Sequence, residues 1–204
     1  MVAWVVDRAR QSGLFTDVLI STDDSEIADV AVREGALCPA LRADELSGDF
    51  VGTEDVLAYE LERYASRKGA MPEVCCCLYG TSVFITKESL QEAKRKLSDP
   101  KIDMVMAVIQ YSHPIERALY FAGPDDLRYR TPEFFTTRTQ DLVPTYYDAG
   151  LFYWVKSQAF FGRGSGHFLP LTRTAVVVDA FSVVDIDSEE DWSRAERVGA
   201  INFV

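Results

Sequence analysis

The stretch VVDIDSEEDW, residues 183–192, runs from an apolar segment through two carboxylates into the start of a helix. Side chains of a strand alternate between its two faces, so Asp185 and Asp187 are expected on one face and Ile186 on the other. The stretch therefore predicts a strand that presents two hard oxygen ligands side by side.

The residues that follow fix where this strand should end. Ser188 is a suitable N-cap and Asp191 stands three residues later, which predicts a helix that extends through Ala195. The carboxylates then lie at the carboxyl end of a strand, the edge at which open α/β sheets bind ligands. Mg²⁺ favours one or two carboxylates completed by phosphate and water. The alternative is a pair of solvated acids beside a capped helix, because short acidic motifs often arise by accident.

Outward from this stretch, helical and strand-like segments alternate along the chain. Hydrophobic periodicity and glycine stops predict helices over residues 2–12, 25–34, 53–67 and 87–97, and strands over residues 17–21, 36–41, 74–79, 103–110, 118–122, 151–155 and 175–179. Apolar strands interleaved with helices indicate an α/β fold with a doubly wound, mostly parallel, Rossmann-like sheet. We expect one domain over residues 1–204.

Two departures from a simple α/β rhythm are visible. Residues 112–170 are richer in short β segments, aromatic residues and turns, which suggests an inserted lid or dimerisation arm and favours a homodimer. A doubly wound sheet normally opens with a strand and a phosphate-binding loop, yet Met1 is followed at once by a helix. The first strand is therefore expected to be missing, unless the sheet simply begins with a helix.

The charge balance narrows the choice of partners. The 204 residues carry 32 Asp and Glu against 21 Lys and Arg, a formal net charge of -11. This excess argues against nucleic acid or an anionic membrane as a partner. No apolar run is long enough to span a membrane, so we expect a soluble, cytoplasmic protein.

Two other motifs are interpreted as structural. The run Cys75-Cys76-Cys77 lies in an apolar strand whose successive side chains face opposite ways, so these thiols cannot chelate one ion together and zinc is not expected. The glycine-rich segment 162–166 lacks the lysine of a phosphate-binding loop and is expected to be a flexible turn. His113 is interpreted as a structural or rim residue.

Several spaced blocks resemble the sugar-acid cytidylyltransferases, the CMP-nonulosonic acid synthetases, over nearly the whole chain. The blocks are SGLF (12–15), VLISTDDSEIA (18–28), LRADELS (41–47), HPIERAL (113–119), TRTQDL (137–142), DAGLFYW (148–154) and the acidic stretch. Within that family, the pair TRTQDL and DAGLFYW is most similar to pseudaminic acid cytidylyltransferases. The resemblance implies a nucleotide-diphospho-sugar transferase type of fold.

The resemblance also implies a reaction. The anomeric hydroxyl of a nine-carbon acid sugar would attack the α-phosphate of CTP and release pyrophosphate in a Mg²⁺-dependent step. Asp185 and Asp187 would hold the metal, which neutralises charge on the phosphates. Arg138 would complete the catalytic set, because a guanidinium can take the sugar carboxylate bidentately.

The remaining site residues follow from the same matches. Arg42 would contact the cytidine and Thr53 the ribose, whereas their plain interpretations are a surface arginine and a helix N-cap. Gln140, Asp148 and Tyr79 would bind the sugar acid together with Arg138. Without the resemblance, Arg138 would be a solvated loop charge and Tyr79 a core aromatic.

Two differences from the family leave alternatives open. The family's glycine-rich opening loop, with its arginine and lysine, has no counterpart before Met1, and residues 80–83 differ from the family's usual prolines. The chain is then a cytidylyltransferase without its opening segment, a glycosyltransferase that uses a nucleotide sugar, or an inactive truncated remnant of the cytidylyltransferase fold. The TRTQDL block argues against the glycosyltransferase.

Overall fold

A computed structural model describes residues 1–48 and 50–202. The helices are α1 (Val2–Gln11), α2 (Ser25–Arg33), α3 (Thr53–Lys68), α4 (Lys87–Leu97), α5 (Ser157–Phe161) and α6 (Glu189–Asn202). The strands are β1 (Val74–Leu78), β2 (Met104–Gln110), β3 (Leu119–Gly123), β4 (Asp126–Tyr129), β5 (Tyr146–Lys156) and β6 (Arg173–Val177). Short 3-10 turns occur at Asp44–Leu46, Ile115–Arg117, Pro132–Phe134 and Thr139–Asp141.

The predicted α/β architecture is confirmed, with a mixed sheet at its centre. The four strands lie in the order β1-β5-β2-β6. Because β5 pairs antiparallel with both β1 and β2, and β2 pairs parallel with β6, three strands run one way and β5 runs the other. Because β5 lies between β1 and β2 and its successive side chains alternate, it contributes side chains to both covered faces of the sheet.

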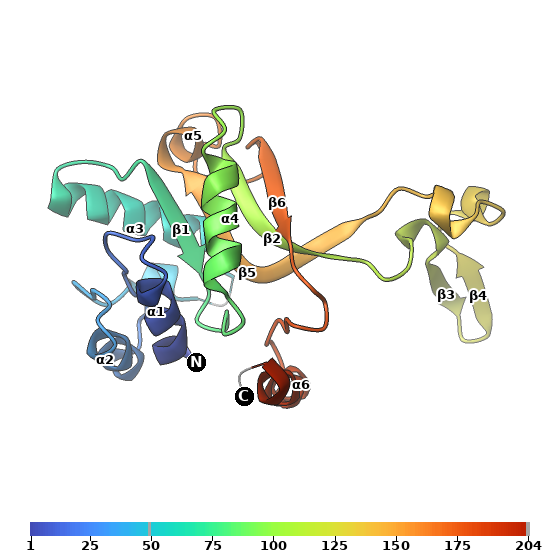
Figure 1. Cartoon of the computed structure of the whole chain (residues 1–204), viewed down its shortest axis with the longest axis horizontal. Coiled ribbons are helices and arrows are strands. Elements are labelled where there is room, and N and C mark those ends of the chain that lie inside the picture. Colours follow the sequence, from blue (N-terminus) through green and yellow to red (C-terminus); the bar gives the residue numbers. More distant parts are fainter. Residues whose placement is uncertain (49, 203–204) are drawn as a thin grey trace.

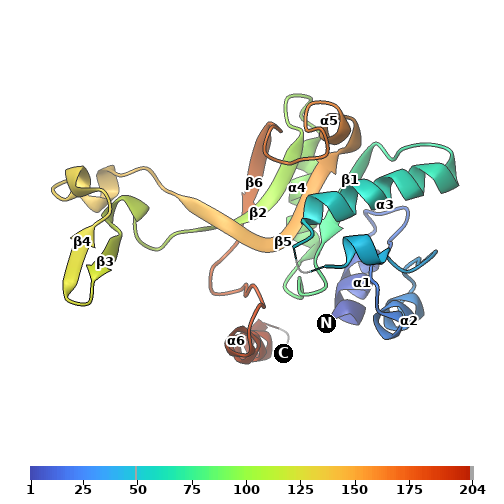
Figure 2. The ribbon, with the colours of Figure 1, turned by 180° about the vertical axis from the view of Figure 1, so that it is seen from behind.

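Helices cover both faces of this sheet (Figures 1 and 2). On one face, α4 packs its Leu90, Ala93 and Leu97 into a core with Trp154 of β5. On the other face, Leu61 of α3 packs with a second group of buried residues: Met104, Tyr153, Val155, Phe160 and Leu171. Burial of these apolar side chains is the main favourable term that holds the layers together.

The local end signals of two helices explain why their predicted bounds hold. Thr86 caps α4, because its side chain accepts a hydrogen bond from the backbone N–H of Ser89. Gly69 ends α3 with a φ of 78°, a left-handed conformation that glycine adopts without steric cost. The helix predicted after Ser188 is also present, although it continues beyond Ala195 to Asn202.

The strands predicted at residues 17–21 and 36–41 are reduced to one parallel bridge, Leu19 with Leu37. Ile20 N–H donates to Leu37 O at 3.0 Å and Leu37 N–H to Val18 O at 2.7 Å. The two segments pair with each other and belong to no strand of the four-stranded sheet, so no ladder extends the bridge.

The predicted strand before Asp185 is wrong. A turn at Asp179, closed by a 3.0 Å bond from Ser182 N–H to Asp179 O, separates this segment from the end of β6 at Val177. Val183 and Val184 are buried, at 5% and 3% exposure, yet they have no ladder partner. The apolar pattern identified core residues correctly, but the burial is achieved by an extended segment outside the sheet.

A narrow arm, residues 111–145, projects from the body (Figure 1). Its hairpin pairs β3 antiparallel with β4, a strand that lies outside the predicted strand ranges. The insertion is shorter than the predicted range of 112–170, since β5 and α5 belong to the body. Among the described residues no helix is long and apolar enough to cross a membrane.

Candidate functional site

The carboxylate of Asp185 lies directly over the backbone of β5. A Cβ placed on Gly150 would stand 2.6 Å from both carboxylate oxygens of Asp185, and Gly150 has a φ of +62°. Only a residue without a side chain allows this close approach without strain. The DAGLFYW block and the acidic stretch, 35 residues apart between Gly150 and Asp185 by their numbering, therefore meet in space.

Negative charge is concentrated around Asp185. Asp185 is an exposed residue, but its pKa is raised, first because nearby protein atoms partly desolvate the carboxylate and then because Asp187, Asp148 and Asp191 are close enough to repel its charge. The start of α6 beside it is capped by two reciprocal hydrogen bonds. Ser188 N–H donates to the Asp191 carboxylate at 3.0 Å, and Asp191 N–H donates to Ser188 Oγ at 3.3 Å. Asp185 and Asp187, the predicted pair, thus lie in one negatively charged site, called the acidic site below.

Oxygen donors of this kind suit a hard cation such as Mg²⁺. In the part of the chain that the structure describes, no group of three or more His, Cys, Asp or Glu side chains is arranged to hold a metal ion. Two carboxylates alone would leave most of a Mg²⁺ shell to phosphate and water.

Asp148 is held in place from two sides. Its Oδ1 accepts a 3.0 Å hydrogen bond from Gly150 N–H, and its Oδ2 accepts a 2.7 Å bond from the Tyr153 hydroxyl. The pKa of Tyr153 is raised, first by burial and then by this bond to Asp148, so the phenol stays a donor. Each carboxylate oxygen keeps a free lone pair for a ligand hydroxyl.

Thr53 and Tyr79 extend the same network. The Thr53 hydroxyl lies 2.8 Å from the Tyr79 hydroxyl, and the Tyr79 ring packs edge-on against Tyr153 with centroids 5.8 Å apart. No side-chain cap bond is recorded at the start of α3, where Gly52 holds the cap position. The interpretation of Thr53 as a helix cap is therefore wrong, and its hydroxyl belongs to the site network instead.

The segment 80–83, which differs from the family pattern in the sequence, connects Tyr79 to β5 by hydrogen bonds. Ser82 is fully buried, and its hydroxyl donates to Leu151 O at 2.7 Å and accepts from Tyr79 N–H at 3.1 Å. Sequence reasoning missed both Ser82 and Tyr153. The position of Tyr153 within the DAGLFYW block was the available signal.

Three of the predicted site residues, Arg42, Arg138 and Gln140, do not lie at the acidic site. Arg42 follows the parallel bridge and pairs with Asp23 at 3.4 Å. Arg138 and Gln140 lie in the arm, which projects away from the body (Figure 1). The Arg138 guanidinium makes two bonds to Asp141, at 2.7 and 3.1 Å, and its side chain is 71% exposed. Within a single chain, the structure therefore does not bring Arg138 to Asp185.

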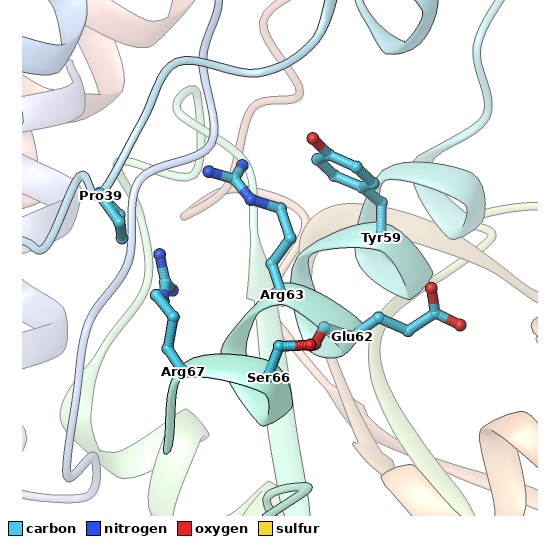
Figure 3. Close-up of a pocket in the computed structure, with 6 residues that line it drawn as sticks. All are labelled: Pro39, Tyr59, Glu62, Arg63, Ser66 and Arg67. Atoms are coloured by element: carbon cyan, nitrogen blue, oxygen red, sulfur yellow. The ribbon is translucent and has the colours of Figure 1, made fainter. Parts of the chain in front are cut away.

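A hollow lies elsewhere, between α3 and the segment after the bridge. It has a volume of about 440 Å³ and is lined by Pro39, Tyr59, Glu62, Arg63, Ser66 and Arg67. Figure 3 shows the Arg63 and Arg67 side chains directed toward Pro39. Arg63 is already paired with Glu60 at 3.0 Å and lies over the Tyr59 ring. None of the predicted site residues lines this hollow.

Comparison with known proteins agrees with the sequence blocks. A family model described as cytidylyltransferase matches residues 1–118. Pseudaminic acid cytidylyltransferase of Campylobacter jejuni is 30% identical over 203 residues, which cover 99% of this chain and 86% of that protein. N-acylneuraminate cytidylyltransferase A of Danio rerio is 27% identical over 202 residues, 97% of this chain and 44% of that protein.

Solved structures share the fold. CMP:2-keto-3-deoxy-manno-octonic acid synthetase, solved with CTP, superposes with a TM-score of 0.64 at 13% identity, covering 98% of this chain and 88% of the other. The 4-diphosphocytidyl-2C-methyl-D-erythritol synthase of Anaerococcus prevotii superposes with a TM-score of 0.57 at 14% identity, covering 96% and 87%. Taken with the family model and the relative in Campylobacter, these findings lead to one conclusion: this chain belongs to the cytidylyltransferase family.

Proposed function

We propose that this chain transfers CMP from CTP to a nonulosonic acid, with pseudaminic acid as the substrate, and releases pyrophosphate in a Mg²⁺-dependent reaction. Family membership and the substrate named for the Campylobacter relative support the reaction class. The observation that carries the proposal is the position of the Asp185 carboxylate over Gly150, with the charges of Asp187 and Asp148 close to it. A site with this excess of negative charge favours a cation that a nucleotide triphosphate can share.

The residues would divide the work as follows. Mg²⁺, when bound, would neutralise the phosphate oxygens and thereby favour attack on the α-phosphorus. Asp185 and Asp187 would hold this ion, with phosphate and water as the other ligands. Asp148, already oriented by Gly150 and Tyr153, would accept hydrogen bonds from the sugar acid. Orientation before binding lowers the entropy that the reaction must lose.

The nucleotide would lie toward the start of α3. Thr53 would approach the ribose and Tyr79, bonded to it, would line the sugar pocket. Arg42 would contact the cytidine after leaving Asp23, to which it is joined by a single long contact of 3.4 Å.

We further propose that the protein is a homodimer and that the arm covers apolar surface on a second copy. Leu119, Phe121, Leu127 and Val143 of the arm are all at least 49% exposed. Exposed apolar surface of this extent marks interaction sites. In such a dimer, Arg138 and Gln140 would reach the sugar carboxylate of the partner's site. Sedimentation at micromolar concentrations should give twice the 22.9 kDa mass of the chain.

The test of the reaction is pyrophosphate release from CTP in the presence of Mg²⁺ and pseudaminic acid. We expect release that requires all three components, with CMP linked to the sugar in equal amount. ATP, GTP and UTP serve as matched nucleotides, and neuraminic acid as the matched sugar. Absence of release, together with no stabilisation by CTP and Mg²⁺, would favour the inactive remnant.

A further inference from the structure

The loop that follows α5 packs against Tyr153 through Phe168. It spans residues 162–172 and is closed by two backbone bonds of 2.9 Å, from Gly164 N–H to Ala159 O and from Gly166 N–H to Phe160 O. A Cβ on Gly164 would stand 2.5 Å from two carbonyl oxygens, so this position excludes a side chain. The glycine-rich turn is therefore held by backbone hydrogen bonds, and it places His167 and Phe168 next to α3.

Glu54, in the first turn of α3, holds this loop with both of its carboxylate oxygens. Oε1 accepts a 2.5 Å hydrogen bond from Phe168 N–H, and Oε2 lies 3.0 Å from His167 Nδ1. The Glu54 side chain is 31% exposed, which limits competition from water. Bonds to an ionised acceptor of this kind are shorter and stronger than neutral ones.

Aromatic ring contacts connect this loop to Asp148 of the candidate site. The Phe168 ring stacks on Tyr153 with centroids 5.4 Å apart and an interplanar angle of 27°. Tyr153 in turn donates to Asp148 at 2.7 Å. Thr53, the residue before Glu54, bonds to Tyr79, whose ring meets Tyr153 at 79°. Two consecutive residues of α3 therefore fix the two rings that flank Tyr153.

We propose that Glu54 is a positioning residue for the sugar-acid site: by holding the backbone of Phe168, it keeps Tyr153 oriented toward Asp148. The assignment rests on the proposed function, because Asp148 matters only if it binds the substrate. A purely structural role, such as compensating the dipole at the start of α3, would be shared by any acid in that turn.

Asp55 provides the matched control for that structural role. It stands in the same first turn of α3 with the same charge, it is exposed, and no side-chain bond to the loop is recorded for it. We expect Glu54→Ala to lower kcat/KM for the sugar acid about 10-fold through misplacement of Asp148, with KM for CTP unchanged. Asp55→Ala should stay within about 2-fold of the wild type.

A double-mutant cycle decides whether Glu54 acts through Tyr153. In a Tyr153→Phe background the loss caused by Glu54→Ala should shrink to less than about 2-fold, because residues that act through one contact are not additive. Glu54→Gln, which keeps an oxygen acceptor for Phe168 N–H, should restore most of the activity. An undiminished loss in the Tyr153→Phe background, or an equal loss in Asp55→Ala, would overturn the proposal.

Two further measurements keep the result decisive. If Glu54→Ala fails to fold, Phe168→Leu keeps the backbone donor and apolar bulk but removes the stacked ring, and the same cycle applies. If the wild type releases no pyrophosphate, the proposed function fails while the positioning role is still read from the side-chain ¹³C resonance of Asp148 at one fixed pH. That resonance should move in Glu54→Ala and stay in place in Asp55→Ala; the reverse would contradict the role.

Discussion

The body and the arm hold their charged side chains in different ways. In the body, Asp148 receives hydrogen bonds from Gly150 and from Tyr153, and the Tyr153 ring is packed between other aromatic rings. In the arm, Arg138 is held by Asp141 of its own turn and remains 71% exposed. The same contrast holds for the core, because the body buries its large apolar residues while the hairpin strand β3 is mostly exposed.

This difference indicates a division of labour. Exchange of an exposed ion pair costs only about 0.2–1 kcal/mol, so Arg138 can be redirected to a ligand carboxylate at little expense. Movement of Asp148 would break a network that extends over several elements of the body. We propose that the body supplies the fixed geometry of the reaction and that the arm adds one adaptable contact to the sugar carboxylate.

The largest effect is expected from the acidic pair of the body. Asp185→Asn or Asp187→Asn should lower kcat about 100-fold to 1000-fold, because each removes a ligand that stabilises developing charge. Pyrophosphate release at saturating CTP and Mg²⁺ measures this loss. The exposed Glu190, in the first turn of α6, provides the control as Glu190→Gln. Equal activity of Asp185→Asn and the control would remove these acids from the mechanism.

Stability should respond to Asp185 in the opposite direction. Its raised pKa means that the folded state disfavours the charged form, so the carboxylate costs stability once the pH exceeds the ordinary value of 3.8. Asp185→Asn should therefore keep or slightly raise the thermal midpoint at pH 7, and the gain should fade as the pH falls toward 3.8. A lower midpoint would mean that the lost activity reflects unfolding.

The next effect separates strain from displacement of the carboxylate. Gly150→Ala should lower activity about 10-fold to 100-fold, because its Cβ would push Asp185 aside. Gly13→Ala has a similar φ of +70° but meets no atom within 4 Å, so it carries the strain alone. Both should lose about 1–2 kcal/mol of unfolding free energy in urea, and only Gly150→Ala should lose activity. Similar activity losses would show that strain alone is responsible.

A smaller effect tests the arm. Arg138→Ala should raise KM for the sugar acid about 10-fold, the loss of one charge-assisted contact, with unfolding free energy changed by less than about 0.5 kcal/mol. Arg128, which pairs with Asp126 in the same arm and is 61% exposed, is the matched control. An unchanged KM in Arg138→Ala would leave the arm without a role in recognition.

The smallest effect lies in the body but away from the acidic pair. The pKa of Asp17 is lowered by hydrogen bonds from Lys68 and Tyr64, so its contribution to stability is present above the ordinary value of 3.8 and is lost as the pH falls through the lowered pKa. Asp17→Asn should cost about 1 kcal/mol at pH 7, and this cost should shrink as the pH falls below 3.8. Urea unfolding at a series of pH values measures the change, and the exposed Asp29 provides the control as Asp29→Asn. A cost that does not shrink with falling pH would contradict the assignment.

The sequence predicts those features that depend on neighbouring residues, and it does not predict those that depend on contacts between distant segments. The bounds of α4 follow from local signals, such as Thr86 at its cap. The placement of Tyr153 does not. Residues 148 and 153 of a regular strand would face opposite sides, but the β2–β5 pairing places five steps of β5 against two of β2, from Met106–Tyr153 to Val108–Asp148. This bulge brings Asp148 and Tyr153 together. Gly150 is a local sign of an irregular strand, but it does not tell which side chains the bulge brings together.

The site shows the same division. The acidic stretch identified Asp185, Asp187 and the helix start at Ser188 from local chemistry. The contact of Asp185 with Gly150 depends on how distant segments meet, which periodicity does not report. The position of Arg138 depends on the direction of the whole arm (Figure 2). Sequence blocks could therefore name these residues but could not decide which of them share one place.

The most direct test of the central claim is where a divalent ion binds when CTP is present. Mn²⁺ can replace Mg²⁺ at sites built from carboxylates and phosphates, and its unpaired electrons broaden nearby NMR resonances. With CTP and Mn²⁺, the account predicts broadening of the side-chain ¹³C resonances of Asp185 and Asp187 and of the Gly150 amide, with loss of the effect in Asp185→Asn. Unbroadened resonances at these three residues, in a sample that turns over CTP, would contradict it.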